Sequence, residues 1–233
     1  MQKTPPLAYE PSDLLATSPE VRPALNGNWQ ARRELAAQLR RLNNALLTAD
    51  VSTQELQSVT AAVQAQAARV EANERVYGNK AQAERIAAQT GQLPFMYHEM
   101  SPVMGNSNAL APPLHIWQAD GRIHGHVTVD WGYEGPSNSV HGGVVALLFD
   151  QLLGFGQRIS GTAGPTGYLT VRYHHPTPLN KPLRMVANVD RIEGRKKFLL
   201  GEIWADGVCT ASCEGVFIIP KNAPDAAALD DPS

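Results

Sequence analysis

The residues best suited to chemistry lie in one short segment that contains a single acid in an apolar run. From residue 144 the chain reads VVALLFDQLLGFG, and Asp150 is its only ionisable residue. A carboxylate in apolar surroundings is costly without partners, and burial makes it a better proton acceptor. We therefore predict Asp150 as a general base. The alternative stays open that Asp150 bonds a neighbouring backbone group or threonine and only fixes the packing.

Two glycines precede this run and predict a donor-rich helix start. His141, Gly142 and Gly143 stand where a helix would begin. Glycines let a substrate approach the backbone, and the N–H groups of a first helical turn can stabilise an oxyanion. The alternative is a flexible turn capped by His141.

The spacing between the two features suggests that two subunits share each site. Gly143 and Asp150 are seven residues apart, which places them on nearly one helix face but about 10.5 Å apart along the axis. One carbonyl cannot easily touch both groups of the same chain. Pairing about a two-fold axis would bring the helix start of one chain to Asp150 of the other. The prediction is an obligate dimer.

Alternating residues on both sides of this helix predict the sheet that positions it. Ile123, Gly125 and Val127 share one face of a strand, while His124 and His126 face the other way. Further strands are predicted at residues 114–119, 166–175, 182–193, 196–206 and 207–219. The last presents the small or apolar residues Cys209, Ala211, Cys213, Gly215, Phe217 and Ile219 on one face. The result is an α+β fold, an antiparallel sheet wrapped around a central helix.

A helical extension precedes the sheet. Residues 24–93 hold no proline and three of the 19 glycines, which favours helix. The spacing of apolar residues predicts two stripes. They are Leu35, Leu39, Leu42 and Leu46, then Leu56, Val59, Val63 and Val70, the second preceded by a capping box at Ser52 and Glu55. We expect a helical hairpin that packs on the rest of the protein or across a dimer; a regulatory or partner-binding role stays open.

Composition bounds the organisation and the partners. We predict an extended or disordered tail at 1–25, the hairpin at 26–93, the sheet domain at 94–220 and a flexible tail at 221–233. A net charge of −2 argues against binding nucleic acid. The longest apolar stretch, residues 144–149, is far below the roughly 20 residues of a membrane span. The first residues lack the core of a signal peptide, so we expect a cytoplasmic protein.

Residues 131–220 resemble the PaaI-like group of hot-dog-fold acyl-CoA thioesterases, which includes the THEM-type enzymes. The matching stretches are YEGPSNSVHGGVVALLFDQLLG (133–154), PTGYLTVRYHHPTPL (165–179) and VDRIEGRKKFLLGEI (189–203). The loop 101–113 looks like the segment that precedes the domain in some members. The resemblance implies a hot-dog fold, hydrolysis of an acyl-CoA thioester without a cofactor, and homodimers that often pair into homotetramers.

The resemblance also implies roles for individual residues. Asp150 matches the catalytic acid, acting as base on water or as nucleophile, and the Gly143 N–H matches the group that polarises the carbonyl. His141 supports the loop, Gly142 belongs to it, and Thr166 matches a threonine that holds water or the carboxylate. The remaining matches are with substrate-binding positions, namely Asn138 near the thioester, and Arg172, His174, Arg195 and Lys196 toward CoA.

The charge run 195–197 gains weight from its position, since cations at a turn can meet the phosphates of CoA while solvated. No metal site is predicted, because His124 and His126 lack a third ligand nearby and His174 and His175 point to opposite faces. The cysteines Cys209 and Cys213 are too far apart along a strand for a disulfide and are read as small buried residues.

Two other functions remain open from the residues. A hot-dog hydratase or dehydratase would need a histidine base beside the acid, and the candidate, His141, lies in the glycine turn. A non-catalytic acyl-CoA-binding protein would keep the fold without needing an acid at the costly position of Asp150. Neither the acyl group nor the choice between base and nucleophile follows from the sequence.

Overall fold

The structure is a computed structural model that describes residues 27–78, 81, 84–85, 88, 99–160 and 163–221. The predicted tails, apart from residue 221, lie outside these residues. So do most of residues 79–98, which include the end of the predicted hairpin and the first residues of the predicted sheet domain.

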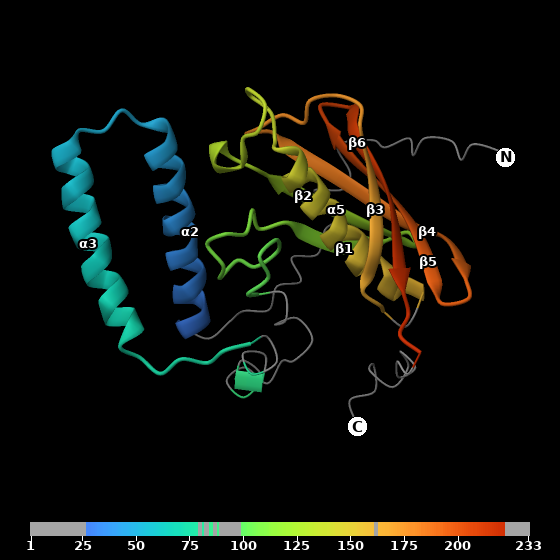
Figure 1. Cartoon of the computed structure of the whole chain (residues 1–233), viewed down its shortest axis with the longest axis horizontal. Coiled ribbons are helices and arrows are strands. Elements are labelled where there is room, and N and C mark those ends of the chain that lie inside the picture. Colours follow the sequence, from blue (N-terminus) through green and yellow to red (C-terminus); the bar gives the residue numbers. More distant parts are fainter. Residues whose placement is uncertain are drawn as a thin grey trace.

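A six-stranded antiparallel sheet forms the main domain (Figure 1). Its order is β1-β2-β4-β5-β6-β3. The strands are β1 (His115–Ala119), β2 (Arg122–Thr128), β3 (Thr166–Tyr173), β4 (Pro182–Glu193), β5 (Lys196–Ala205) and β6 (Val208–Ile218). Each predicted strand is present, with ends within two residues of the prediction. The α+β fold class is therefore confirmed.

Helix α5 (Gly142–Gly156) lies against one face of the sheet and supplies the centre of the core (Figure 1). Its buried side chains include Leu148, Phe149, Leu152 and Leu153. The small face predicted on the last strand explains this close approach. A Cβ atom at Gly215 would lie 2.7 Å from Cδ1 of Leu153, so the helix could not sit at this depth against a larger residue.

The sheet does not enclose α5 on all sides. Leu147 is 41% exposed and Asp150 is half-buried. Both observations have one cause, because the neighbouring strand β3 lies at the edge of the sheet. Among the described strands β3 pairs only with β6, and most of its residues are exposed. Its second edge therefore offers unpaired backbone groups.

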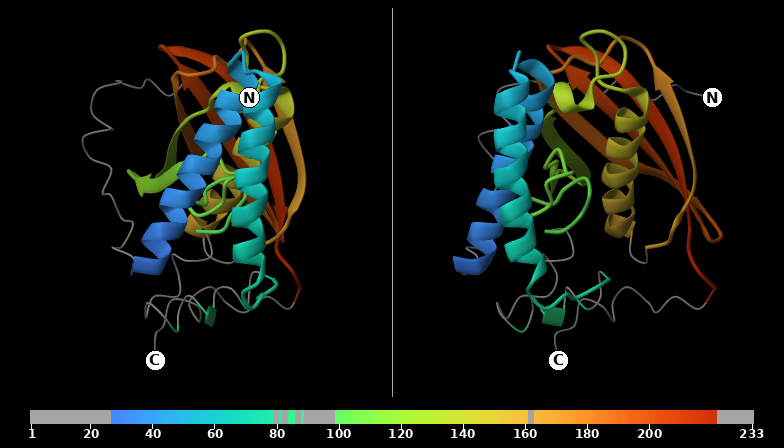
Figure 2. Two further views of the ribbon diagram at one scale, coloured as in Figure 1. Left: turned by 90° about the vertical axis from the view of Figure 1, so that its left-hand side faces the viewer. Right: turned by 60° about the vertical axis from the view of Figure 1, so that its left-hand side comes forward.

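Among the elements that the structure describes in full, α2 (Gly27–Thr48) and α3 (Thr53–Glu71) precede the sheet domain. They lie side by side, with the turns of residues 99–113 between α2 and the sheet (Figure 2). The predicted cap is present, since the Ser52 side chain accepts a hydrogen bond from the Glu55 N–H. Residues 72–78, inside the window predicted as helical, form no α-helix.

Helix α2 attaches to the domain through a different face from the predicted leucine stripe. Trp29 and Ala36 are buried, and Arg33 forms two hydrogen bonds of 2.8 Å with the carboxylate of Glu99. Arg40 donates to the Asn108 carbonyl at 2.8 Å. The leucines themselves stay exposed. The hairpin thus packs on the sheet domain through this face of α2, while the described residues leave the leucine stripe 39–57% exposed.

Two short 3-10 helices complete the described chain, η2 (Trp131–Tyr133) and η3 (Gln157–Ser160), and the sequence analysis predicted neither. None of the helices in the described part of the chain is long and apolar enough to cross a membrane.

Candidate functional site

Asp150 has one defined polar partner, on the edge strand. The Thr166 hydroxyl donates a hydrogen bond of 2.7 Å to Oδ1 of Asp150. Asp150 comes from the middle of α5 and Thr166 from the first residue of β3, so the contact joins the central helix to the edge of the sheet. The carboxylate is half-buried and Thr166 is exposed, so the pair can be reached from solvent. A carboxylate with one fixed oxygen is oriented and keeps the other for a proton.

A β-bulge turns Thr166 toward the helix. On β3, Leu169 and Val171 pack toward the core, and strict alternation would put Thr166 on the opposite face. The register shifts between Thr166 and Tyr168, so Gly167 is an extra residue there. An added Cβ at Gly167 would lie 3.1 Å from the Ile218 side chain and 3.2 Å from the Val216 carbonyl. Bulges of this kind re-aim a side chain next to a functional site.

Gln157 fixes the segment that leads into β3. Its buried side chain accepts from the Gly164 N–H at 2.7 Å and donates to the Gly164 carbonyl at 2.9 Å. Gly164 is two residues before Thr166, so the end of α5 and the start of β3 are tied together. The sequence analysis did not single out Gln157. The signal was a long amide just after the apolar run.

Lys197 supports the same end of α5 and corrects the interpretation of the charge run 195–197. Its side chain is 1% exposed, and Nζ donates to the carbonyls of Gln157 at 3.1 Å and Ser160 at 3.2 Å. Burial lowers the pKa of Lys197. On β5, Lys197 shares a strand face with Leu199, Gly201 and Ile203, which are buried in the core. The strand therefore points one of the three cations inward. Only Arg195 and Lys196 are left facing solvent.

The start of α5 is capped by His141. Its Nδ1 accepts a hydrogen bond of 2.9 Å from the Gly143 N–H, and its carbonyl accepts from the N–H groups of Val144 and Val145. The Gly143 N–H, predicted as an oxyanion donor, is thus occupied by a side chain of its own loop. The capping alternative for His141 is the one observed. A substrate oxygen would have to replace the imidazole as acceptor.

Tyr173 holds the glycine turn, and the sequence analysis missed it. Its hydroxyl donates a hydrogen bond of 2.9 Å to the Gly142 carbonyl. An added Cβ at Gly142 would lie 3.3 Å from the Tyr173 hydroxyl oxygen, a close contact that would require the ring to shift slightly. Tyr173 ends β3 while Thr166 begins it. One edge strand therefore contacts both the start of α5 and Asp150.

Asn138 lies in the loop before α5 with a positive φ of 59°, a conformation that asparagine tolerates. Its N–H donates to the Glu134 carboxylate at 2.7 Å, and its side chain donates to the Ser137 hydroxyl at 3.2 Å. Among the described residues these bonds tie Asn138 to its own loop and not to the glycine turn.

The four cations predicted for CoA are not brought together in one chain. Arg172 pairs opposite Ser212 on β6, and the His174 ring lies 2.8 Å from that serine's hydroxyl. Lys196 pairs opposite Ile218, six residues further along β6, and Arg195 donates to a carbonyl at the same end. Six residues of strand span about 20 Å. One pair therefore lies toward Tyr173 and the helix start, and the other toward Thr166.

Both cysteines are free thiols with no disulfide. Burial, followed by the nearby Asp150 and Glu214 carboxylates, raises the pKa of Cys213 to about 12, against a smaller lowering by a backbone hydrogen bond at Thr170. Burial, followed by the Glu202 carboxylate, raises the pKa of Cys209 to about 11. A thiol that stays protonated is a poor nucleophile. The prediction of small buried residues holds for Cys213, while Cys209 is half-buried.

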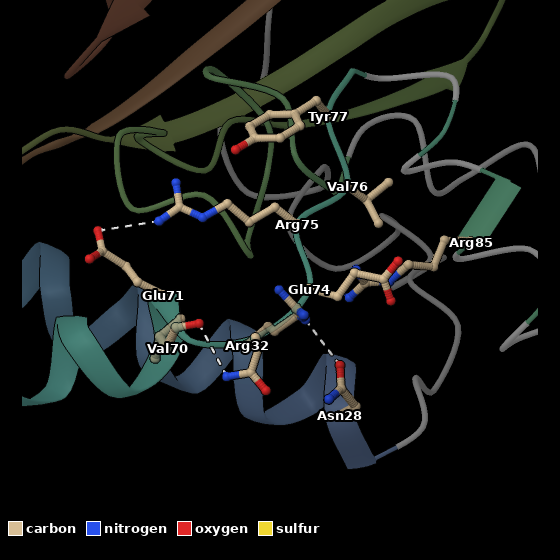
Figure 3. Close-up of a pocket in the computed structure, with 10 residues that line it drawn as sticks. Asn28, Arg32, Val70, Glu71, Glu74, Arg75, Val76, Tyr77 and Arg85 are labelled. Carbon is tan, nitrogen blue, oxygen red and sulfur yellow. Dashed lines mark hydrogen bonds and ion pairs between the residues drawn. The ribbon is translucent and has the colours of Figure 1, made fainter.

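A cavity of about 640 Å³ lies away from these residues, where the beginning of α2 meets the end of α3 (Figure 3). Its walls include Arg32, Arg75 and Arg85 together with Glu71 and Glu74. Arg75 already pairs with Glu71 at 3.7 Å, and the two acids offset most of the positive charge. The cavity shares no residue with the predicted site, so the candidate site is the α5–β3 edge. No group of three acidic, cysteine or histidine side chains in the described ranges is arranged to hold a metal ion.

The sequence and the structure were compared with those of known proteins. No family model matches the sequence. Protein RHA08564, a thioesterase superfamily protein of known crystal structure, is 33% identical, with a TM-score of 0.69 over 87% of this chain and 94% of that chain. The PaaI protein of the E. coli phenylacetic acid degradation operon is 19% identical over 47% of this chain and 81% of that one, with a TM-score of 0.44.

A curated relative matches over a shorter stretch. Acyl-coenzyme A thioesterase THEM4 of Xenopus laevis is 38% identical over 65 residues, which are 28% of this chain and 29% of that protein. The match thus spans less than a third of the relative's length.

Proposed function

Because the chain belongs to the thioesterase superfamily and has its hot-dog fold, we propose that it hydrolyses an acyl-CoA thioester to a free acid and CoA. The observation that carries this proposal is the hydrogen bond from Thr166 to Asp150 at an open edge of the molecule. It gives an oriented carboxylate in the middle of α5 that can be reached from solvent. The name of the THEM4 relative supports acyl-CoA as the substrate class.

Asp150 has two workable roles in this reaction. As a general base it takes a proton from water while the water oxygen attacks the thioester carbon. The tetrahedral intermediate then collapses, the carbon–sulfur bond breaks, and the CoA thiolate takes up a proton. As a nucleophile, a carboxylate oxygen of Asp150 attacks the thioester carbon, and the carbon–sulfur bond breaks to release the CoA thiolate, which takes up a proton. Water then cleaves the resulting anhydride to the free acid and the Asp150 carboxylate. Thr166 acts in both by fixing one carboxylate oxygen. All groups come from the chain and from water.

The first turn of α5 stabilises the developing oxyanion. In the free protein the Gly143 N–H donates a hydrogen bond to His141 Nδ1. When substrate binds, the thioester oxygen takes the place of Nδ1 as the acceptor. The exchange keeps the N–H satisfied before and after binding. Tyr173 keeps the turn in place through Gly142. This arrangement makes His141 a capping residue and not a base, which disfavours a hydratase.

Each complete site is built from two chains. Gly143 and Asp150 are separated by about 10.5 Å along α5, and one chain holds its four candidate CoA cations in two distant pairs. A partner chain that pairs along the free edge of β3 brings a second copy of both halves to the α5–β3 edge and covers Leu147. The helix start of one chain then serves Asp150 of the other, and the solvated cations contact the phosphates of CoA.

The first experiment measures CoA release from a panel of acyl-CoAs with a thiol reagent. We expect turnover that Asp150→Asn lowers by about 100-fold or more, since general base catalysis contributes 10²–10⁴-fold. Asp190→Asn, an acid on β4 outside the site, is the control and keeps its activity. Tight binding without release at any chain length contradicts the proposal and indicates a binding protein. Addition of water to an unsaturated acyl-CoA indicates a hydratase instead.

The second experiment tests the shared sites. Gly143→Pro removes the donor and Asp150→Asn removes the acid, so each homodimer lacks both complete sites. Subunit exchange between the two variants restores one complete site in each heterodimer. We expect recovered activity on mixing. Two variants that fold and exchange subunits without any recovery would show that one chain holds the whole site.

A further inference from the structure

We infer that the helical hairpin α2–α3 is a second self-association surface, which pairs with the hairpin of another copy of this chain into a four-helix bundle. It is separate from the pairing along β3. The inference rests on which faces of the two helices the described structure covers.

Helix α2 presents three distinct rows of side chains. One row packs on the sheet domain and consists of Trp29, Arg33, Ala36 and Arg40. A second row consists of Leu35, Leu39, Leu42 and Leu46, and a third of Glu34, Gln38, Arg41 and Ala45. At 3.6 residues a turn the rows lie about 120° apart. The first row is in use and the polar row suits solvent, whereas the leucine row is 39–57% exposed, so it is an apolar face that the described chain covers only in part.

Helix α3 also has an apolar face that is exposed, and it buries even less of its surface than α2. It has 19 residues and buries none of them. Of its predicted stripe, Leu56, Val63 and Val70 are 38–64% exposed, like the leucine row of α2, and Val59 is half-buried. Isolated helices of this length are marginal in water, and helices in proteins are stabilised chiefly by packing an apolar face. The neighbouring α2 supplies that packing only in part, since α3 meets it around Val70 and still buries no residue.

The chemistry of the two stripes favours a second copy over other occupants. Leucines at spacings of four, three and four residues form the seam of antiparallel helix bundles. The stripes lack the aromatic and arginine anchors that mark surfaces for unlike partners. A helix that lies on a lipid surface carries many basic residues on its polar face, whereas α3 holds Arg69 against Glu55 and Glu71.

The available area is sufficient for a stable pair. Helices of 22 and 19 residues are about 33 and 28 Å long, and a stripe roughly 10 Å wide gives about 600 Å² for each chain. Two hairpins then bury about 1,200 Å², the lower bound for specific interfaces. The same patch meets itself, as a two-fold axis requires.

The test is the mass of the full-length protein in solution, measured by sedimentation at several concentrations. Leu39→Lys with Leu46→Lys places two cations in the seam, and we expect it to halve the mass of the wild-type particle. Gln38→Lys with Ala45→Lys adds the same charge to the polar row and leaves the mass unchanged. All four positions are exposed, so both variants fold, as circular dichroism will show.

The expected number of chains in the particle rests on the proposed function, because that proposal includes pairing along β3. The outcomes nevertheless distinguish the two proposals. With β3 pairing intact, the leucine variant falls from four chains to two and keeps thioesterase activity. Without β3 pairing, it falls from two chains to one. An unchanged mass overturns the inference, and so does a monomeric wild type. Unchanged mass with loss of thermal stability would mean that the chain covers its own stripe. Unchanged mass with loss of flotation on phosphatidylcholine vesicles would mean that lipid does.

Discussion

Helices α5 and α3 are both recognisable from their apolar residues, but the molecule uses them in opposite ways. The sheet covers α5, which buries six residues including Leu148 and Leu152. The described chain covers α3 only in part, and α3 buries none of its residues. An apolar pattern therefore predicts that a face will be covered, but not by which chain. The exposed part of α5, around Leu147 and Asp150, is a smaller example of an apolar face that the described chain does not cover.

The largest expected difference between the two helices is in stability. Leu152→Ala in α5 should lower the free energy of unfolding by about 2–5 kcal/mol, because it removes a fully buried side chain and leaves a cavity. Val63→Ala in α3 should change it by less than about 0.5 kcal/mol in dilute solution, as surface substitutions do. Urea denaturation measures both. Equal losses would show that the described chain covers α3 as fully as α5.

The attachment of α2 offers a second contrast, since α2 is fixed to the domain where α3 is not. Arg33→Met removes both guanidinium hydrogen bonds to the carboxylate of Glu99, which is 5% exposed. We expect a loss of about 3 kcal/mol, because breaking a buried ion pair costs more than the pair contributes.

Hydrogen exchange locates the effect of Arg33→Met. Amides of α2 should exchange faster, whereas those of α5 keep their protection. Arg41→Met, on the polar row of the same helix, is the matched control and should change neither. Faster exchange throughout the sheet would contradict the view that α2 is an attachment and not part of the core.

At the candidate site, the contrast is between two faces of one strand. Thr166→Val removes the hydroxyl that orients Asp150 and should lower kcat by about 10–100-fold, since a hydrogen bond to a charged group contributes about 1.5–3 kcal/mol. Thr170→Val, at an exposed position further along β3, should leave kcat unchanged. If Thr166→Val acts only on KM, the hydroxyl contacts substrate instead of the carboxylate.

The sequence predicted the elements better than their contacts. Alternation defined the strands to within two residues, and the apolar run defined α5, because both patterns reflect burial along a regular element. Thr166 was predicted from the family resemblance, but strict alternation points it away from Asp150. The bulge at Gly167 reverses that direction, and its signal is a single glycine between a threonine and a tyrosine.

Other features depended on contacts between distant segments. Tyr173 and Gln157 act through backbone groups 31 and 7 residues away, and no residue-type pattern marks a carbonyl as a partner. Lys197 was read with its cationic neighbours, although its place in β5 turns it toward the core. The occupation of the Gly143 N–H by His141 likewise depends on one side-chain rotamer.

The smallest expected effect is the pH dependence of stability that Cys213 causes. This thiol lies beneath α5 and reports whether that helix is packed on the sheet. Its pKa of about 12 in the folded protein is above the value of about 8.5 for an unfolded thiol. The folded state therefore favours the protonated form, and this stabilisation is complete below pH 8.5 and lost progressively toward pH 12. Between pH 8 and 9.5 we expect the wild type to lose about 1 kcal/mol relative to Cys213→Ala. The same loss in both proteins would show that Cys213 is not the titrating group.

The rate at which the Cys213 thiol reacts also compares the packing of the helices. At pH 8 the folded protein should react slowly with a disulfide reagent, since a buried, protonated thiol is inert. Leu152→Ala loosens α5 and should speed the reaction at Cys213. The paired leucine substitutions in α2 should leave it unchanged, because the hairpin lies apart from β6 and its covering helix (Figure 1). Cys209→Ala is the background for both measurements, so that the rate reports one thiol. Acceleration by the α2 substitutions would show that the hairpin and the seating of α5 are coupled, and that the two regions are one cooperative unit.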